Sequence, residues 1–419
     1  MKKTGRHTWL TGILCLLLAG SLLLGTTGCT SVKAADLMDG ITAHPVTGKI
    51  ADKTFASGVA DFSTKLFTSV AQDGKNTVLS PLSVMLALAM TANGADGQTL
   101  AQMEQVLGNM PIDSLNAYLL SYINGLPSEE KSKLHIANSI WFRDDERLQV
   151  NRDFLQKNAD FYHASVYKSA FDKTTVSDIN SWVSTNTDGL VENILDDISA
   201  DAVLYLINAM AFDAEWQNIY ESYDVSEKTF TALNGDEQPV DMMHSEEHTY
   251  LEDDRATGFL KPYKNGRYSF MALLPKEGIN FREYVASLTG ERFLNLLKNQ
   301  SNETVVTAIP KFRTEYSIDF ADTLKKLGMP DAFSGAADFS KMARSSDGDL
   351  FISRVLHKAY IEVDERGTKA GAATVVEMKD TAALYEPKSV ILDRPFVYAI
   401  LDGETGLPIF LGTTTEIAP

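Results

Sequence analysis

The sequence predicts an α+β fold, because helical patterns fill its first half and short strand patterns fill its second half. Apolar side chains recur at helical spacing between Phe55 and Val70, at positions 55, 59, 62, 66, 67 and 70. From about residue 228, short runs that are typical of strands dominate. No Pro-, Gly- or Ser-rich break divides residues 53–419, so we expect one large domain there.

The helices expected in the first half follow one another closely. After the helix at 55–70, the segment Ser80-Pro81-Leu82-Ser83 opens a second helix, with its hydroxyl groups as candidate caps. Residues 83–124 and 150–195 also have mainly helical patterns. The apolar run at 203–212 instead predicts a buried strand.

The second half is expected to consist mostly of strands, with helices again at 281–299 and 319–328. The strand segments are, in order, TYLED (249–253), GFLKPY (258–263), YSFMALLP (268–275), TVVTAIPKF (304–312), VLHKAYIEVDE (355–365), RPFVYAILD (394–402) and PIFLGTTTEIA (408–418).

The first 29 residues are organised as a secretory signal. Basic residues at positions 2, 3 and 6 precede an apolar run from Leu10 to Leu24. A small residue then precedes Cys29, as in the lipoprotein box whose cysteine becomes the acylated first residue. We therefore expect residues 1–28 to be removed and Cys29 to carry a lipid that holds the chain at the outer surface of a bacterial membrane. An ordinary signal peptide and an uncleaved anchor are the alternatives.

The composition is strongly acidic, with a net charge of −18 at pH 7. Without the three basic residues of the signal segment, 35 Lys and Arg face 56 Asp and Glu, a net charge of −21. Such a surface repels nucleic acid and anionic lipid, so we expect no nucleic-acid partner, and membrane attachment has to rest on the lipid. Residues 29–52, which include Gly40, Pro45 and Gly48, are predicted as a tether for the domain at 53–419.

Enzymatic motifs are weak in this chain. It has no G-x-S-x-G elbow, P-loop or Cys nucleophile after residue 29. The segment from Gly94 to Thr99 resembles a phosphate loop faintly, but it lacks the lysine and the spacing, so a turn between helices is expected. The isolated His357 fits a hydrogen-bonded core histidine better than a catalyst. We therefore expect no enzyme and no cofactor.

One metal motif needs separate treatment. His244-Ser245-Glu246-Glu247-His248 matches H-x-x-E-H, a zinc-peptidase pattern in which two histidines on one helix bind zinc and Glu247 acts as the base. The flanking segments predict strands rather than a long buried helix. We expect no metal, and keep a zinc hydrolase that uses His244 and His248 as a remote alternative.

Several short motifs follow one another along the chain: NTVLSPLS (76–83), GADGQT (94–99), INSWV (179–183), NAMAFDAEW (208–216), DMM (241–243), LP (274–275), IPKF (309–312), RPF (394–396) and FLG (410–412). In their order and spacing they resemble the serpins, a family of serine protease inhibitors, and together they cover nearly all of residues 53–419. Each motif is weak alone, but their common order makes a chance match negligible. The resemblance implies the serpin fold, with helices around three mixed or mainly antiparallel sheets and an exposed reactive-centre loop.

The resemblance also implies a function for the segment ERGTKAGAATVVEMKDTAALYEP at 365–387. Serpins expose this loop as bait, and a target serine protease cuts it and forms an acyl-enzyme. The cut loop then inserts into the main sheet as a new strand and traps the protease. The chain is thus expected to be a monomeric protease inhibitor. The runner-up is a serpin-fold binding protein that is cut only as a substrate.

The residues of this segment suit a loop that becomes a central strand. Alternate positions would face inward, and all of them are small or uncharged, as a buried strand face requires. Charged Lys369, Glu377 and Lys379 would face outward, although Arg366 and Lys369 stand where the family has acidic residues. The inward set is Thr368, Ala370, Ala372, Thr374, Val376 and Met378; the hinge implied by the family is Glu365, Gly367, Thr368, Ala370, Gly371, Ala372, Ala373 and Thr374.

The family's spacing places the scissile bond fourteen residues beyond Gly367, between Thr381 and Ala382. A threonine before the bond suits a small apolar pocket, so the expected targets are elastase-like, proteinase-3-like or subtilisin-like proteases. A shift by one residue is an alternative. Cleavage after Lys379, which would suit trypsin, is a further one.

The resemblance assigns roles to five residues in the body of the domain. Ser80, Ser83, Asn208 and His357 match the shutter, a polar cluster that controls strand separation by hydrogen bonding. Trp216 matches the breach, where the loop first enters the sheet.

Overall fold

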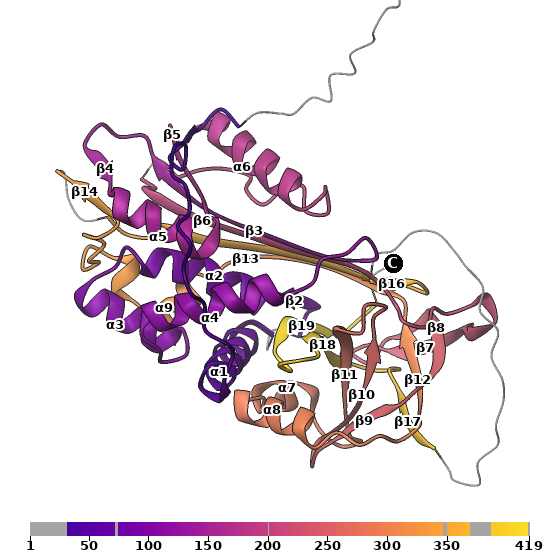
Figure 1. Ribbon diagram of the computed structural model, residues 1–419. Coiled ribbons are helices and arrows are strands. Elements are labelled where there is room, and N and C mark those ends of the chain that lie inside the picture. Colours follow the sequence, from indigo (N-terminus) through magenta and orange to yellow (C-terminus); the bar gives the residue numbers. More distant parts are fainter. Residues whose placement is uncertain (1–31, 72–73, 200, 347–349, 369–386, 418–419) are drawn as a thin grey trace, which may run out of the picture. The chain divides into compact units, whose positions relative to one another are not determined.

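The computed structural model describes residues 32–71, 74–199, 201–346, 350–368 and 387–417 (Figure 1). Its helices are α1 (Lys53–Val70), α2 (Pro81–Ala92), α3 (Gly97–Val106), α4 (Ile112–Gly125), α5 (Arg152–Tyr162), α6 (Lys173–Asn186), α7 (Phe281–Ala286), α8 (Gly290–Lys298) and α9 (Ala321–Leu327), with 3₁₀ turns η2 (Ser222–Asp224) and η3 (Asp331–Phe333). The predicted α+β class is confirmed.

Three main sheets organise the described strands. The first, sheet A, has the order β1 (Ala35–Asp36), β5 (Ser165–Ser169), β3 (Ser132–Arg143), β6 (Leu204–Glu215), β16 (Gly367–Thr368), β15 (Arg354–Val363) and β13 (Phe312–Asp319). Sheet B has the order β2 (Thr77–Leu79), β19 (Pro408–Thr414), β18 (Phe396–Asp402), β11 (Tyr268–Pro275), β10 (Ala256–Pro262) and β9 (Thr249–Glu252). Sheet C has the order β17 (Lys388–Ile391), β12 (Val305–Pro310), β8 (Glu237–Glu247) and β7 (Val225–Thr231), and β4 (Leu148–Val150) pairs with β14 (Ala343–Ser345).

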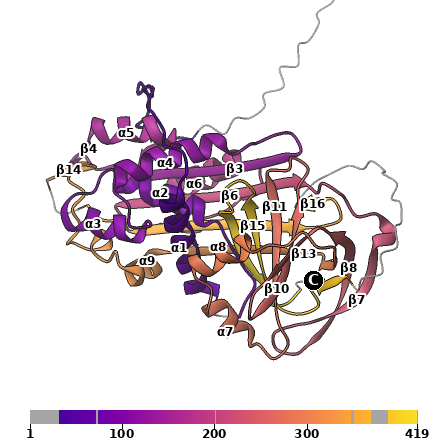
Figure 2. The same ribbon diagram turned by 60° about the horizontal axis from the view of Figure 1, so that its bottom comes forward.

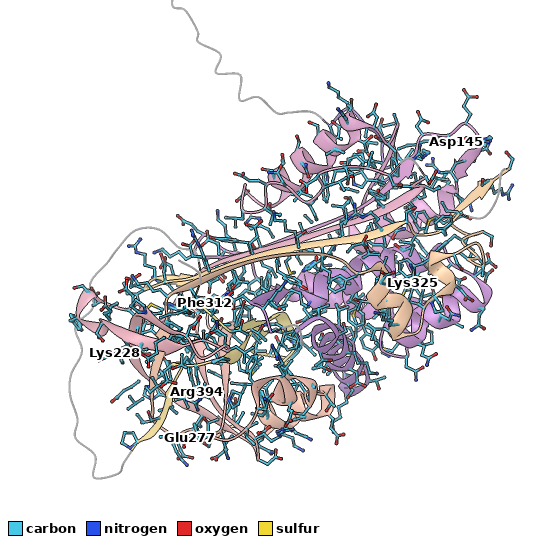
Figure 3. All side chains as sticks on the ribbon, turned by 180° about the vertical axis from the view of Figure 1, so that it is seen from behind. Asp145, Lys228, Glu277, Phe312, Lys325 and Arg394 are labelled. Carbon is cyan, nitrogen blue, oxygen red and sulfur yellow. The ribbon has the colours of Figure 1, made fainter. Side chains whose placement is uncertain are left out.

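Sheet A separates two apolar cores, which explains why β6 carries apolar side chains on both of its faces from Leu204 to Phe212, apart from Asn208. Ile207 and Ala209 pack with residues of α6 on one face, whereas Leu206 and Met210 pack with α2 and the rest of the main core on the other. Figure 1 shows α6 on one side of this sheet and α1, α2 and α4 on the other, and Figure 2, in which the bottom is turned forward, shows α1 and α2 in front of the sheet.

Helix α2 is the central helix of the main core. Ser80 caps it by accepting a hydrogen bond from the Ser83 N–H at 3.2 Å, and Pro81 occupies its first turn. Every residue from Pro81 to Ala92 is buried, so this helix is covered on all sides. Its capped N-terminus contacts sheet A, where the Ser80 N–H donates to His357 on β15.

The sequence prediction was wrong in two places in the first half. The long strand β3 was not anticipated, and β5 interrupts the stretch at 150–195 that was expected to be mainly helical. Strand β3 is only partly buried over its first half, so its apolar pattern is diluted by Lys133 and His135. Both side chains lie within ion-pair distance of Asp188, which follows α6 and is distant in the sequence.

Residues 32–52 lie along the domain, in contrast to the prediction that residues 29–52 form a free tether. Ala35 and Asp36 add strand β1 to the edge of sheet A by pairing with β5. The backbone N–H groups of Lys33 and Ala34 donate to the Asp178 carboxylate at 3.1 Å and 2.9 Å. These contacts are backbone bonds to distant residues, which sequence composition does not reveal. The compact unit therefore begins at Val32 rather than at residue 53.

Candidate functional site

The candidate site begins where β15 ends and the chain turns back into sheet A. Residues Asp364–Thr368, here called the loop root, form this turn, and their last two residues are strand β16. Thr368 pairs with Val363 of β15 on one side and with Ala214 of β6 on the other. The first residues of the predicted reactive loop therefore already occupy a strand position, antiparallel to both neighbours.

The turn is closed by the side chain of Asp364. Its Oδ1 accepts hydrogen bonds from the N–H groups of Arg366 at 2.8 Å and Gly367 at 3.2 Å. The Asp364 N–H in turn donates to the Gly367 carbonyl at 3.0 Å. Burial raises the pKa of the Asp364 carboxyl, and the two N–H donors partly offset this effect.

Trp216 and Tyr220, which follow β6, donate hydrogen bonds to three more carbonyl groups of the turn. The Trp216 indole Nε1–H donates to the Asp364 carbonyl at 2.9 Å, and its backbone N–H donates to the Arg366 carbonyl at 2.8 Å. The Tyr220 backbone N–H donates to the Glu365 carbonyl at 2.8 Å. Trp216, predicted as the breach residue, is fully buried at this position.

Gly367 and Thr368 are tightly fitted into the sheet. A Cβ atom at position 367 would lie 1.9 Å from the Ala214 carbonyl oxygen, so no other residue fits this backbone path. The buried Thr368 hydroxyl lies 2.6 Å from the Tyr263 hydroxyl. The Tyr263 ring stacks on the Trp216 ring with centroids 4.5 Å apart. The ring that contacts Thr368 is thus packed against the ring that donates to the Asp364 carbonyl.

The Glu365 side chain connects the loop root to sheet C. Its carboxylate lies 2.7 Å from the Lys311 ammonium, which also lies 2.9 Å from the Asp241 carboxylate on β8. Burial opposes the charge on Lys311, but the bonds from Glu365 and Asp241 prevail and raise its pKa. The ammonium is thus charged at neutral pH and bridges the two sheets.

Deeper in the sheet, the four predicted shutter residues form one hydrogen-bonded cluster with Asn138. This shutter cluster (Ser80, Ser83, Asn138, Asn208 and His357) joins α2, β3, β6 and β15. The Ser80 N–H donates to His357 Nε2 at 3.1 Å, and Ser83 Oγ donates to Asn138 Oδ1 at 3.2 Å. Asn208 donates to Ser83 Oγ and Asn138 Oδ1 and contacts His357 Nδ1 through its own Oδ1.

The geometry of His357 indicates a structural group and not a base. Its Nε2 accepts a backbone N–H, so the neutral ring carries its proton on Nδ1 and donates it to Asn208. Complete burial lowers the pKa of His357 to about 3. The ring therefore stays uncharged under ordinary conditions and holds β15 to β6.

The zinc alternative has the wrong local geometry. His244 lies within β8 and His248 directly follows it, so extended backbone separates them by about 13 Å instead of one helical turn. His244 Nε2 lies 3.1 Å from Ser226 Oγ, and Glu247 is bound to Lys261. Among the described residues, no group of three or more His, Cys, Asp or Glu side chains could hold a metal ion.

Several predicted site residues lie outside the described residues. They are Cys29, the hinge residues Ala370, Gly371, Ala372, Ala373 and Thr374, and the expected scissile pair Thr381 and Ala382.

Sequence reasoning missed four contributors to the site: Asn138, Tyr220, Tyr263 and Lys311. Lys311 belongs to the IPKF motif, but its partner Glu365 is 54 residues away, so the motif alone does not indicate the ion pair. Asn138 stands in an apolar run, which is a usual sign of a buried hydrogen bond. Tyr220 and Tyr263 carry no such local signal, because their role depends on the folding of distant segments around the loop root.

Comparison with known proteins identifies the family. The family model described as "Serpin (serine protease inhibitor)" matches residues 57–417. An uncharacterized serpin-like protein of Thermococcus kodakarensis is 33% identical over 382 residues, which cover 88% of each chain. The crystal structure of a thermophilic serpin, tengpin, in the native state is 51% identical, covers 92% of this chain and 100% of that one, and has a TM-score of 0.89.

The chain is similar to two states of tengpin to different degrees. The latent-state structure of tengpin is 49% identical, covers 89% of this chain and 100% of that one, and has the lower TM-score of 0.79. The arrangement of this chain is therefore more similar to the native state than to the latent state. From the match of the family model, the serpin relatives and the shared fold, we conclude that this chain belongs to the serpin family of serine protease inhibitors.

Proposed function

We propose that this chain inhibits serine proteases by trapping them during loop insertion. A target protease cleaves the bond between Thr381 and Ala382, forms an acyl-enzyme, and is displaced as the loop becomes a strand between β6 and β15. One observation carries the proposal: Gly367 and Thr368 already lie between these two strands. The first two residues of the strand that the loop would form are thus already paired in this structure.

Insertion has to separate strands that are paired in this structure. Below β16, β6 and β15 pair directly in parallel, from Arg354 opposite Tyr205 to Tyr360 opposite Ala211. An inserted strand would replace this parallel ladder by two antiparallel ones, which lowers the free energy of the sheet. The shutter cluster crosses the same boundary, so its hydrogen bonds contribute to the barrier that keeps the uncut protein in this state.

The cleavage position and the surface location complete the proposal. Thr381 before the bond favours proteases with small apolar pockets, of the elastase-like or subtilisin-like kind. No helix in the described part of the chain is long and apolar enough to cross a membrane. A lipid at Cys29, as the signal segment suggests, would hold the inhibitor at the outer face of a bacterial membrane, where it meets secreted proteases.

The test mixes the chain from residue 32 with pancreatic elastase, neutrophil elastase, subtilisin, trypsin and chymotrypsin. Denaturing gels detect a covalent complex, and mass spectrometry identifies the released C-terminal peptide. A band at the summed mass and a peptide that begins at Ala382 support the proposal. Cleavage without that band would assign the chain to the substrate-only class, and a peptide that begins at Asp380 would move the bond to the trypsin alternative.

Two variants sharpen this test. Ala370→Arg places a charge at the next position that is expected to face inward, beyond the already buried Thr368, and should convert the inhibitor into a substrate, because insertion would bury an unpaired charge. Incorporation of labelled fatty acid in a bacterial host, compared between wild type and Cys29→Ser, tests the anchor. Equal labelling of the two proteins would refute it.

A further inference from the structure

A buried ion pair lies directly behind the loop root and has no part in the function described so far. The Lys261 ammonium on β10 lies 2.7 Å from the Glu247 carboxylate at the end of β8. The two side chains are only 2% and 7% exposed. A buried ion pair contributes little net stability compared with apolar residues of the same size, so its presence calls for a specific role.

The ion pair is in contact with the residues that hold the turn of the loop root. The Lys261 ammonium lies 4.3 Å from the centroid of the Tyr220 ring and 5.5 Å from that of Trp216. Both distances are within the range of a cation–π attraction, which is strongest where the cation is shielded from water. Tyr220 and Trp216 are the residues whose N–H groups satisfy the loop-root carbonyls.

Glu247 in turn fixes the position of the lysine and of the Tyr220 hydroxyl. Ser245 Oγ donates to the Glu247 carboxylate at 2.8 Å and lies 3.0 Å from Thr307 Oγ1 on β12. The Tyr220 hydroxyl lies 3.2 Å from the same Ser245 Oγ. The charged groups are thus oriented by sheet C, while the aromatic rings that they meet lie under the loop root.

We propose that the Lys261–Glu247 pair is a positioning device for the reactive loop: it holds Tyr220 and Trp216 against the loop root and so keeps β16 inserted between β6 and β15. After cleavage, insertion then continues from β16, whose two residues are already paired with both neighbouring strands. This avoids the unfavourable first step of strand formation at the moment when trapping competes with hydrolysis of the acyl-enzyme. The consequence for trapping rests on the proposed function, whereas the positioning of β16 does not.

The first experiment measures hydrogen exchange at the loop root by mass spectrometry in the uncut chain from residue 32, without protease. Lys261→Met should raise the exchange rate of the peptide that contains Gly367 and Thr368 about tenfold, because the cation is lost and Glu247 is left unpaired. The control is Lys276→Met, which removes an equally short but exposed ion pair to Glu252. It should leave the exchange of that peptide unchanged.

A double variant separates positioning from a general loss of stability. In Lys261→Met/Glu247→Gln no charge is buried, so the midpoint of chemical denaturation should return close to that of wild type. Exchange at the loop root should stay raised, because the cation above Tyr220 is still missing. Full recovery of slow exchange in this variant would overturn the proposal and make the pair a purely structural element.

If the lysine variants fail to fold, Tyr220 provides an independent test. Tyr220→Leu keeps the backbone N–H bond to Glu365 but removes the ring under the ammonium, whereas Tyr220→Phe keeps the ring and loses only the hydroxyl contact with Ser245. The proposal expects faster exchange at the loop root in the leucine variant than in the phenylalanine variant. Equal exchange in the two variants would contradict it.

The stoichiometry of protease inhibition then connects the positioning to function. Lys261→Met should need several molecules per trapped protease where wild type needs about one, because late insertion lets more acyl-enzyme hydrolyse. If wild type traps protease and Lys261→Met changes neither exchange nor stoichiometry, the inference fails while the proposed function stands. If wild type forms no complex but exchange responds as expected, the proposed function fails while the positioning stands.

Discussion

Asn208 and His357 are register partners across the parallel pair β6–β15, and their side chains are hydrogen-bonded to each other. The contact lies on the boundary that loop insertion would have to open. The cluster extends on either side, because His357 also accepts the Ser80 N–H at the start of α2 and Asn208 reaches Asn138 on β3. Strand separation here therefore breaks buried hydrogen bonds, and each unpaired group would be costly.

The first prediction concerns the loss of folding stability at acidic pH. The folded pKa of His357 is lowered to about 3, below that of an unfolded histidine near 6.5. Between these values only the unfolded chain binds the proton, so stability is fully present above pH 6.5 and is lost as the pH falls. This residue should lower the free energy of unfolding by about 2 kcal/mol between pH 7 and pH 5, measured by chemical denaturation.

Replacement of His357 separates its contribution to the pH dependence of stability from the contributions of other titrating groups. His357→Gln retains a polar side chain without a titrating group, so it should be less stable than wild type at pH 7 and depend less on pH down to pH 5. The two denaturation curves should therefore approach each other as the pH falls. Parallel pH profiles for the two proteins would show that His357 does not carry the effect.

The second prediction concerns the N-terminal segment. Asp178 is buried on α6 and accepts the N–H groups of Lys33 and Ala34. Asp178→Ala leaves these donors without their partner and should lower the free energy of unfolding by about 1–3 kcal/mol. Chemical denaturation of the chain from residue 32 measures the change.

Two further measurements test whether that loss of stability comes from the bonds between Asp178 and the N-terminal segment. Asp254→Ala removes a carboxylate that is 80% exposed and should change the unfolding free energy by less than about 0.5 kcal/mol. A chain that begins at residue 53 should be less stable than one that begins at residue 32, and Asp178→Ala should have less effect in it. Equal stability of the two chains would mean that residues 32–52 behave as the free tether that composition predicts.

The sequence predicted local structure well where the apolar pattern of an element decides it. The apolar run around Asn208 predicted a buried strand, and the resemblance to the serpins implied that Ser80 and His357 belong to one polar cluster. It could not predict that Lys33 and Ala34 bind Asp178, since the donors are backbone groups of an unpatterned segment. Tyr263 was missed for a similar reason, because its partner Thr368 is more than a hundred residues away.

The third prediction tests the backbone path of the loop root. Gly367→Ala would place a methyl group against the Ala214 carbonyl, where a Cβ would lie at 1.9 Å. Backbone cannot yield to this extent, so β16 should leave the sheet and its amides should exchange faster. More inhibitor should then be cleaved per trapped protease.

The matched control for this variant is Gly335→Ala. A Cβ at position 335 meets no atom within 4 Å, and Gly335 is not among the glycines with positive φ. This variant should be as stable as wild type, with unchanged exchange at the loop root. A wild-type exchange pattern in Gly367→Ala would show that Gly367 and Thr368 are not held between β6 and β15.

The last prediction uses the hydroxyl pair of Thr368 and Tyr263, which lie 2.6 Å apart with no exposure to water. Thr368→Val and Tyr263→Phe each remove one hydroxyl with little change in shape and leave the other buried without its partner. Each should speed exchange at the loop root and lower the unfolding free energy by about 1–2 kcal/mol. The double variant removes both groups, so it should lose less than the sum of the single losses. Additive losses in such a cycle would mean that the two hydroxyls do not bind each other, and that Thr368 is held in the sheet by its backbone alone.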